Sequence, residues 1–160
     1  PSHPGPAEVT VLGVLEPDPA TMDLAEAPLV MAGGAGLAAG LDTATATLTF
    51  GLLSQVASAL GAAAGATRVA TDAGWATPGR QIGTTGVAIR PRLYVAFGIS
   101  GAVQHTGGLG SPEHLVSVNL DAHCPMTAGS SLGIVADARG TLVALAGRLG
   151  VPVPGEVRDA

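Results

Sequence analysis

Residues 93–105 read Leu93-Tyr94-Val95-Ala96-Phe97-Gly98-Ile99-Ser100-Gly101-Ala102-Val103-Gln104-His105, the strongest structural pattern in this 160-residue chain. The first five residues form a continuous apolar run, which is typical of a strand buried on both faces of a parallel sheet. Gly98 ends the run, and the segment from Ser100 to His105 is predicted to start a helix. A buried strand, a glycine turn and a helix in this order predict one unit of an α/β domain.

Further strands and helices are predicted on both sides of this unit. Short β-rich or apolar runs predict strands over 9–15, 28–32, 67–71, 115–118 and 133–136. Leu48, Leu52, Val56 and Leu60 recur every four residues and predict a helix over about 47–63, capped by Thr45 or Thr47. A last amphipathic helix is expected to end at Gly150. Alternating strands and helices predict a Rossmann-like three-layer α/β domain with a mainly parallel sheet.

Composition excludes several classes of function. The chain is 47% hydrophobic and 12% charged, which indicates a folded domain, and its net charge of −5 with no basic run argues against nucleic-acid binding. The single cysteine excludes an internal disulfide and a cysteine-based metal cluster. The N-terminal segment has neither the basic start nor the apolar run of a signal peptide, and no apolar stretch predicts membrane insertion. We therefore expect a cytoplasmic bacterial protein.

Candidate ligand-binding segments follow the predicted strands or lie in the loops between them. They are Gly33–Gly36, Thr67–Arg68, Gln81–Gly86 and Gly98–His105, and the single residues Asn119 and Asp137 further along the chain. Ligands of open α/β sheets bind at the carboxyl ends of the strands, so we expect these segments to converge there.

The segment Gly98–His105 has two interpretations on local evidence. Its small residues would let a phosphate approach free backbone N–H groups at a helix start, where the helix dipole favours negative charge. The alternative is a tight strand–helix turn in which His105 is a hydrogen-bonded structural histidine. Arg68 is likewise either a planar cation beside an aromatic ligand or an exposed side chain with a buried stem. The loop Gln81–Gly86 is either a ligand loop or a surface turn.

The order of these segments resembles the C-terminal domain of electron-transfer flavoprotein α subunits. The resemblance runs from about Leu29 to Leu149, and its most specific part is Ser100-Gly101-Ala102-Val103-Gln104-His105 after Leu93-Tyr94-Val95-Ala96. It implies residues 29–150 as an FAD-binding domain, 1–28 as an N-terminal strand and linker, and 151–160 as a tail. The resemblance implies one non-covalent FAD as the cofactor.

The resemblance also implies the residues that would bind this FAD. Arg68, with Thr67 beside it, would lie against the flavin ring, Thr85 would bond flavin N5, and His105 would lie near the C2 carbonyl. The full set implied is Thr67, Arg68, Ile82, Gly83, Thr84, Thr85, Ser100, Gly101, Ala102, Val103, Gln104, His105, Asn119 and Asp137.

A member of this family is expected to carry electrons rather than to convert a substrate of its own. The resemblance implies a heterodimer with a β subunit, a dehydrogenase as electron donor and a downstream acceptor such as a quinone oxidoreductase. Two alternatives remain at this point. One is a nucleotide-binding regulatory or structural domain without flavin chemistry, and the other is an NAD-linked enzyme, for which the Gly-x-Gly-x-x-Gly pattern with a downstream acid is missing.

The chain departs from the family pattern at three cationic positions. Ala35 stands in place of the Arg of Gly-Gly-Arg-Gly, Val87 in place of the Lys of Gln-Thr-Gly-Lys, and Leu120 in place of the Lys of Asn-Lys-Asp. Loss of one charge-assisted phosphate contact is expected to weaken FAD binding by about 1.5–3 kcal/mol, or roughly one to two decades in affinity.

Overall fold

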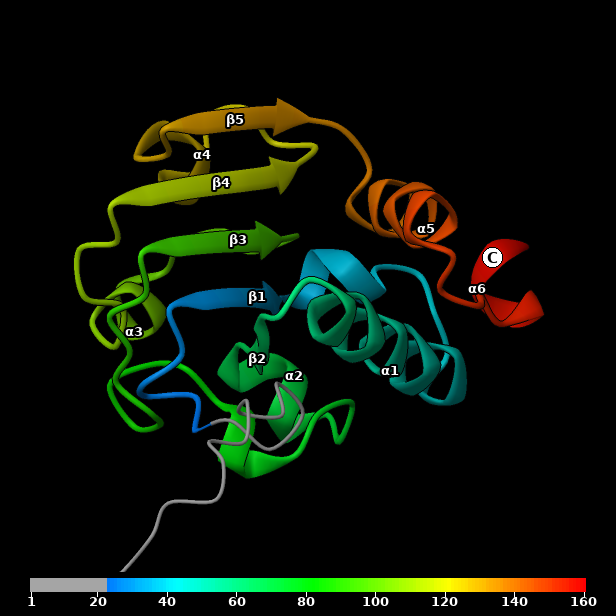
Figure 1. Ribbon diagram of the computed structural model, residues 1–160, viewed down its shortest axis with the longest axis horizontal. Helices are drawn as coiled ribbons and strands as arrows, with labels where there is room; N and C mark the ends of the chain where they lie inside the picture. Colours follow the sequence, from blue (N-terminus) through cyan, green and yellow to red (C-terminus); the bar gives the residue numbers. More distant parts are fainter. Residues whose placement is uncertain (1–22) are drawn as a thin grey trace, which may run out of the picture.

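The computed structural model describes residues 23–160, so the strand expected over 9–15 lies outside the described residues. The sheet has five strands, all parallel, in the order β2-β1-β3-β4-β5 (Figure 1). The strands are β1 (Leu29–Gly33), β2 (Ala63–Ala66), β3 (Leu93–Phe97), β4 (His114–Asn119) and β5 (Leu132–Val135). The expected α/β class is therefore confirmed, with a sheet that is wholly parallel.

Strand β3 lies at the centre of the sheet and contributes to the hydrophobic core on both of its faces. Tyr94 and Ala96 belong to one buried cluster, whereas Phe97 belongs to the other. Successive side chains of a strand point to opposite faces, so an uninterrupted apolar run is the sequence that a strand covered on both sides requires. The prediction for residues 93–97 is confirmed in class and in both bounds.

Helices and loops cover both faces and give three layers. On one face α1 (Thr43–Ala59) packs beside α5 (Ala138–Leu149) and α6 (Gly155–Arg158), as Figure 1 shows. The opposite cluster contains Ile82, Ile89 and Met126, the last from the short helix α4 (Pro125–Ala128). The remaining short elements are η1 (Ala35–Ala38), α2 (Arg68–Asp72), η2 (Pro78–Arg80) and α3 (Val103–Thr106).

Helix α1 begins four residues earlier than predicted. Its N-cap is Asp42, whose carboxylate accepts a hydrogen bond from the Thr45 backbone N–H at 2.8 Å, so the expected caps Thr45 and Thr47 are wrong. This bond also lowers the pKa of Asp42. Two residues of the expected apolar stripe, Leu48 and Leu60, are 40% and 42% exposed. The buried face instead consists of Ala46, Thr49, Phe50, Leu52, Leu53, Val56 and Ala57.

The strand predicted over residues 67–71 is wrong, because these residues form the start of helix α2. The strand lies just before it, over Ala63–Ala66, and Thr67 is the N-cap of α2. The helix expected from Ser100 is also shorter than predicted, since α3 has only four residues and begins at Val103. The first difference moves the end of a strand and the second moves the start of a helix, each by a few residues.

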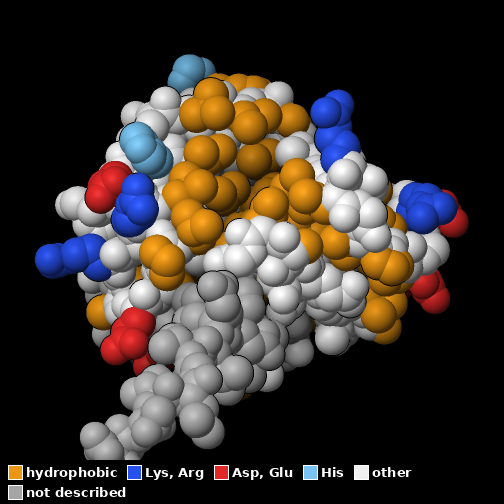
Figure 2. Space-filling view, in the orientation of Figure 1, with side chains coloured by type: hydrophobic (Ala, Val, Ile, Leu, Met, Phe, Trp, Pro, Cys, Tyr) orange, Lys and Arg blue, Asp and Glu red, His pale blue; other side chains and the backbone are white. Residues whose placement is uncertain are grey.

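The C-terminal part of the chain follows the prediction more closely. Gly150 ends α5 with a φ of 71°, a left-handed conformation that glycine adopts without steric cost. The segment expected as a tail contains α6, whose Val157 is buried in the core. At the edge of the sheet, β5 exposes Leu132 and Val135, and Figure 2 shows apolar side chains gathered over this side of the molecule. Within residues 23–160, no helix is both long and apolar enough to span a bilayer.

Candidate functional site

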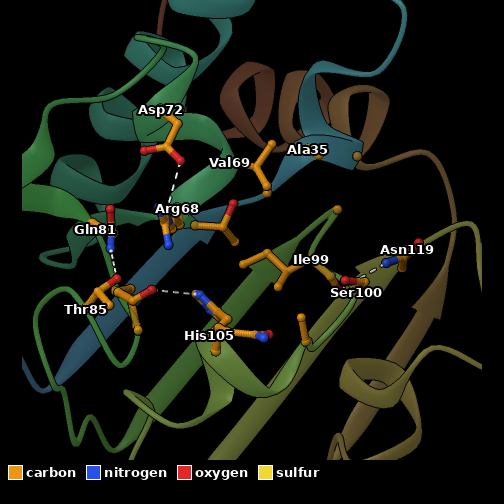
Figure 3. Close-up of a pocket in the computed structure, with 18 residues that line it drawn as sticks. Ala35, Arg68, Val69, Asp72, Gln81, Thr85, Ile99, Ser100, His105 and Asn119 are labelled. Carbon is orange, nitrogen blue, oxygen red and sulfur yellow. Dashed lines mark hydrogen bonds and ion pairs between the residues drawn. The ribbon is translucent and has the colours of Figure 1, made fainter.

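A cavity of about 590 Å³ lies at the carboxyl ends of the strands, a volume typical of small-molecule sites. Four successive strand ends and one loop line it (Figure 3). Its walls are Gly34, Ala35 and Gly36 after β1; Thr67, Arg68, Val69 and Asp72 after β2; Gln81, Ile82, Gly83 and Thr85; Gly98, Ile99, Ser100, Ala102, Gln104 and His105 after β3; and Asn119. Strands β1 and β3 are neighbours, and the chain leaves β1 toward β2 on the other side, so the cavity lies at the switch point of the sheet.

Most of the site residues predicted from the sequence line this cavity. They are Thr67, Arg68, Ile82, Gly83, Thr85, Ser100, Ala102, Gln104, His105 and Asn119. The predicted residues Thr84, Gly101, Val103 and Asp137 do not line it. Ile99 also lines it and lies inside the predicted segment Gly98–His105, although it is not in the set that the resemblance implies. Val69 lines it too, and as an apolar residue outside the predicted segments it carried no signal that the sequence alone could reveal.

The glycines after β1 and β3 bring two turns into direct backbone contact. The Gly34 N–H donates to the Phe97 carbonyl and the Gly36 N–H to the Gly98 carbonyl, both at 2.9 Å. A Cβ built on Gly34 would lie 2.5 Å from the Gly98 carbonyl oxygen, and Gly98 itself has a φ of +61°. Only glycine fits this arrangement, so the primary reason for these glycines is the packing that forms the floor of the cavity.

Backbone N–H groups beside this floor are available to a ligand. Within residues 23–160, the N–H groups of Ser100, Gly101 and Ala102 donate to no protein acceptor. The predicted helix dipole contributes little here, because α3 has a single turn and cannot sum many peptide dipoles. Adjacent unbonded N–H groups still suit an anionic oxygen, which supplies the acceptor that each of them lacks.

Thr67 contributes an unbonded hydroxyl to the same cavity. Its Oγ1 is buried and has no hydrogen-bond partner, although an N-cap threonine usually accepts a bond from its own helix. A buried polar atom without a partner is unfavourable by about 1–3 kcal/mol, and a polar ligand that bonds it removes that penalty. The free N–H groups and this hydroxyl therefore fit a polar, anionic cofactor such as a dinucleotide.

Arg68 and Asp72 carry the formal charges of the described cavity wall. Arg68 Nε lies 3.2 Å from the Asp72 carboxylate, and the two side chains are 65% and 64% exposed. An exposed pair of this kind contributes little to stability, so the Arg68 guanidinium can turn toward a ligand at small cost. The structure places the exposed Arg68 side chain at the cavity wall, and its role as a cation beside a ligand stays a prediction.

His105 is bonded to the protein through both ring nitrogens. Only 5% exposed, it has Nε2 at 2.7 Å from the Tyr94 hydroxyl and Nδ1 at 3.1 Å from the Ile82 carbonyl. A carbonyl only accepts, so Nδ1 donates to Ile82 and Nε2 of the neutral ring accepts from Tyr94. Burial lowers the pKa of His105, opposed by the Ile82 carbonyl, and burial raises the pKa of Tyr94.

The structural interpretation of His105 is therefore the one that these contacts favour. The neutral ring keeps no N–H for a ligand, because its one N–H is bonded to the Ile82 carbonyl. Its role near the flavin C2 carbonyl stays a prediction. What the described contacts do provide is a buried link between strand β3 and the loop that begins at Ile82.

Asn119 and Asp137, predicted to contact the adenosine half of a ligand, lie in different surroundings. The Asn119 side-chain amide donates to the Ile99 carbonyl at 3.2 Å and stays at the cavity wall. Asp137 is the N-cap of α5 and accepts from the Gly140 N–H at 2.6 Å. The structure thus brings Asn119 to the site and gives Asp137 a helix-capping role outside the cavity wall.

Comparison with known proteins finds one family. The family model described as "Electron transfer flavoprotein FAD-binding domain" matches residues 23–110. An electron transfer flavoprotein subunit alpha, mitochondrial, of Oryza sativa subsp. indica is 46% identical over 115 residues, which are 72% of this chain and 30% of the rice protein. Protein FixB of Azorhizobium caulinodans is 43% identical over 128 residues, covering 80% of this chain and 33% of that protein.

A more distant relative shows the same relation. The electron transfer flavoprotein subunit alpha of Thermoanaerobacterium thermosaccharolyticum is 35% identical over 127 residues, which are 79% of this chain and 36% of that protein. The chain thus spans about a third of the length of the curated relatives it matches. With a family model that matches most of the chain and relatives of this identity, the chain belongs to the electron transfer flavoprotein alpha subunit family, through its FAD-binding domain.

Proposed function

We propose that the chain binds one FAD non-covalently in the cavity at the carboxyl ends of the strands and serves as an electron carrier. The observation that carries the proposal is a set of unbonded polar groups: the N–H groups of the cavity residues Ser100 and Ala102, that of Gly101 between them, and the hydroxyl of Thr67. When bound, FAD supplies the redox chemistry by accepting and releasing electrons. The protein residues bind and orient it.

Each part of the cavity has a role in this proposal. The unbonded N–H groups hold the diphosphate, and the Thr67 hydroxyl bonds a polar atom of the cofactor. Arg68 places positive charge near the flavin ring, which favours electron density there. His105 holds the loop at Ile82 in place from beneath, through the bonds at 2.7 and 3.1 Å to Tyr94 and Ile82.

The partners follow from the family and are part of the proposal. We infer a heterodimer with an electron transfer flavoprotein β subunit, because the relatives that the chain matches are named as alpha subunits. A dehydrogenase would donate the electrons and an acceptor such as a quinone oxidoreductase would receive them. The chain would then have no substrate of its own to convert, and its location in the bacterial cytoplasm stays a prediction.

A second candidate function is a nucleotide-binding regulatory or structural domain without a flavin. The shortage of positive charge favours it: among the described residues that line the cavity, Arg68 is the one fixed cation and it is paired with Asp72. Ala35 lines the cavity where the family pattern has an arginine.

The visible absorption spectrum of the purified chain separates the two functions. A yellow protein with flavin bands, or an apoprotein that takes up added FAD in a one-to-one ratio, supports the electron carrier. A colourless, folded chain that binds ADP but takes up no FAD supports the second candidate and contradicts the first. Thr67→Val is the matched variant, since it keeps the shape of the side chain and removes the hydroxyl that we assign to the cofactor.

A further inference from the structure

The side chain of Gln81 lies between two threonines at the cavity wall. Its Nε2 donates to Thr85 Oγ1 at 3.0 Å, and its Oε1 accepts from Thr71 Oγ1 at 2.9 Å. Figure 3 shows Gln81 directly beside Thr85, with the Nε2–Oγ1 bond drawn between them. The loop is closed underneath by the Val87 N–H, which donates to the Gln81 carbonyl at 2.7 Å. A backbone bond between Val87 and Gln81 therefore closes the loop, and a side-chain bond joins Gln81 to Thr85 within it.

The chemistry of the amide decides what the Thr85 hydroxyl can do. The Nε2 group of a glutamine only donates, so Thr85 Oγ1 is the acceptor in this bond. A hydroxyl that accepts one bond still has its own proton to donate. Within residues 23–160, Thr85 donates that proton to no side chain or carbonyl, and Thr85 lines the cavity. The proton is thus available to an acceptor atom inside the cavity.

Thr71 sets which end of the amide faces Thr85. Its hydroxyl lies 2.9 Å from Gln81 Oε1 and 2.9 Å from the Arg68 carbonyl, and both of these atoms are acceptors. When the Thr71 proton goes to Oε1, it holds the oxygen of the amide away from Thr85 and the NH₂ group toward it. Thr71 comes from α2, the helix whose Arg68 lines the cavity, and Thr85 comes from the loop, so the amide connects these two segments.

We propose that Gln81 is a positioning residue that turns the Thr85 hydroxyl into a hydrogen-bond donor toward an acceptor atom of the bound flavin ring. The inference rests on the proposed function for its ligand, and on the two side-chain bonds of Gln81, to Thr71 and to Thr85, for its direction. Gln81 acts through Thr85.

The test is a double-mutant cycle with FAD as the ligand. Gln81→Glu keeps the shape of the side chain but replaces the NH₂ donor by a carboxylate, which only accepts and draws the Thr85 proton to itself. In the parent, Thr85→Ala should weaken FAD binding about two- to tenfold, the value of one ordinary hydrogen bond. In the Gln81→Glu background, the same substitution should cost less than about twofold, because the hydroxyl no longer donates to the ring. The added negative charge is present both in Gln81→Glu and in the double variant, so its repulsion of FAD cancels when these two proteins are compared.

Two controls keep the cycle interpretable. Thr77→Ala removes an exposed hydroxyl four residues before Gln81 that does not line the cavity, and it should leave FAD affinity unchanged. Gln81→Leu keeps the loop neutral and lets the Thr85 hydroxyl rotate freely, so its affinity should fall between those of the parent and Gln81→Glu. Equal cost of Thr85→Ala in the parent and in the Gln81→Glu background overturns the inference.

A measurement on the ligand-free chain separates this inference from the proposed function. The side-chain NH₂ signals of Gln81, identified in ¹H–¹⁵N spectra by their loss in Gln81→Leu, should move in Thr85→Ala and in Thr71→Val but not in Thr77→Ala. If the chemical shifts of the Gln81 NH₂ group do not change in Thr85→Ala, the proposed contact is overturned whether or not FAD binds. If these signals move in Thr85→Ala but the parent takes up no FAD, the contact stands. The proposed function and the ligand part of the inference are then contradicted.

Discussion

Ala35 is the cavity residue that stands where the family pattern has an arginine. It lines the wall beside the glycine turn after β1 and carries no charge. We expect Ala35→Arg to tighten FAD binding by about tenfold or more, since a charge-assisted phosphate bond is worth roughly 1.5–3 kcal/mol. Titration of the apoprotein with FAD, followed by flavin fluorescence, measures this. Ala59→Arg, which adds the same charge at an exposed position outside the cavity wall, should leave the affinity unchanged.

His105 should make the stability of the fold depend on pH. Burial lowers its pKa, so an unfolded chain binds a proton at a pH where the folded chain does not. The contribution is therefore fully present above the unfolded pKa of about 6.5 and is lost as pH falls through the folded pKa. We expect the free energy of unfolding, measured with urea between about pH 5 and 7.5, to change less with pH in His105→Gln than in the parent. His114→Gln, at an exposed position, should keep the parent slope.

The contrast between His105 and Thr85 shows what a sequence can predict about single residues. Both residues were identified as site candidates, and both line the cavity. Their hydrogen-bond partners could not be predicted, because Tyr94 reaches His105 from the adjoining strand and Ile82 reaches it from 23 residues away. Without those partners, local sequence favoured a structural histidine, and only the family resemblance implied a place for His105 near the flavin.

At the scale of the elements, the packed turns after β1 and β3 should tolerate no added methyl group. A Cβ on Gly98 would collide with the Leu37 backbone N and the Gly36 carbonyl carbon, and its φ of +61° disfavours any other residue. Gly98→Ala should lower the free energy of unfolding by at least about 1–3 kcal/mol. Gly147→Ala, in the exposed interior of α5 with open space around it, should instead raise it by up to about 1 kcal/mol. Urea denaturation of the three proteins measures both effects, and a Gly98→Ala protein as stable as the parent would contradict the close packing.

The N-terminus of α5 offers a test of what Asp137 does. Its carboxylate accepts from the Gly140 N–H at 2.6 Å, so Asp137→Ala should cost about 1 kcal/mol of stability through the lost cap. Asp137→Asn keeps a capping oxygen and should cost much less. If Asp137 only caps the helix, both variants bind FAD as the parent does. A selective loss of FAD affinity in both would instead support the adenosine contact that the family resemblance implies.

The error at β2 and α2 has a physical cause. Strand β2 is Ala63-Ala64-Gly65-Ala66, residues with weak strand preference, whereas Thr67-Arg68-Val69-Ala70-Thr71 contains the β-branched residues that favour strands. Pairing with β1 makes a strand of the first segment, and a Cβ on Gly65 would collide with Ile82. Local preference is overridden by a long-range contact, which a single sequence does not contain.

At the scale of the whole molecule, the site could be predicted from topology better than from any one motif. Parallel strands bring their carboxyl ends to one edge of the sheet, so segments after four strands converge although they are spread from Gly34 to Asn119. The convergence needed only the alternation of strands and helices, which the apolar runs revealed. The volume of the cavity and the unbonded Thr67 hydroxyl depend on packing, and no sequence pattern predicts them.

The negative net charge of the chain determines how we expect FAD affinity to change with salt concentration. The net charge is −5, and the cavity wall pairs its one fixed cation with an acid, so the long-range field repels a diphosphate while backbone N–H groups attract it at short range. Salt screens the long-range part over about 10 Å at 0.1 M and leaves direct hydrogen bonds largely intact. FAD affinity should therefore hold or rise between about 0.05 and 0.5 M salt.

Ala35→Arg should give the opposite trend. An added guanidinium at the diphosphate makes part of the binding an ion pair, so the affinity of this variant should fall with salt, and its advantage over the parent should shrink toward 0.5 M. Titrations of both proteins with FAD at low and high salt measure the two trends. A steep loss of affinity in the parent would mean that a cation outside the described cavity wall holds the diphosphate, and the backbone N–H groups of Ser100, Gly101 and Ala102 would then lose the main role assigned to them.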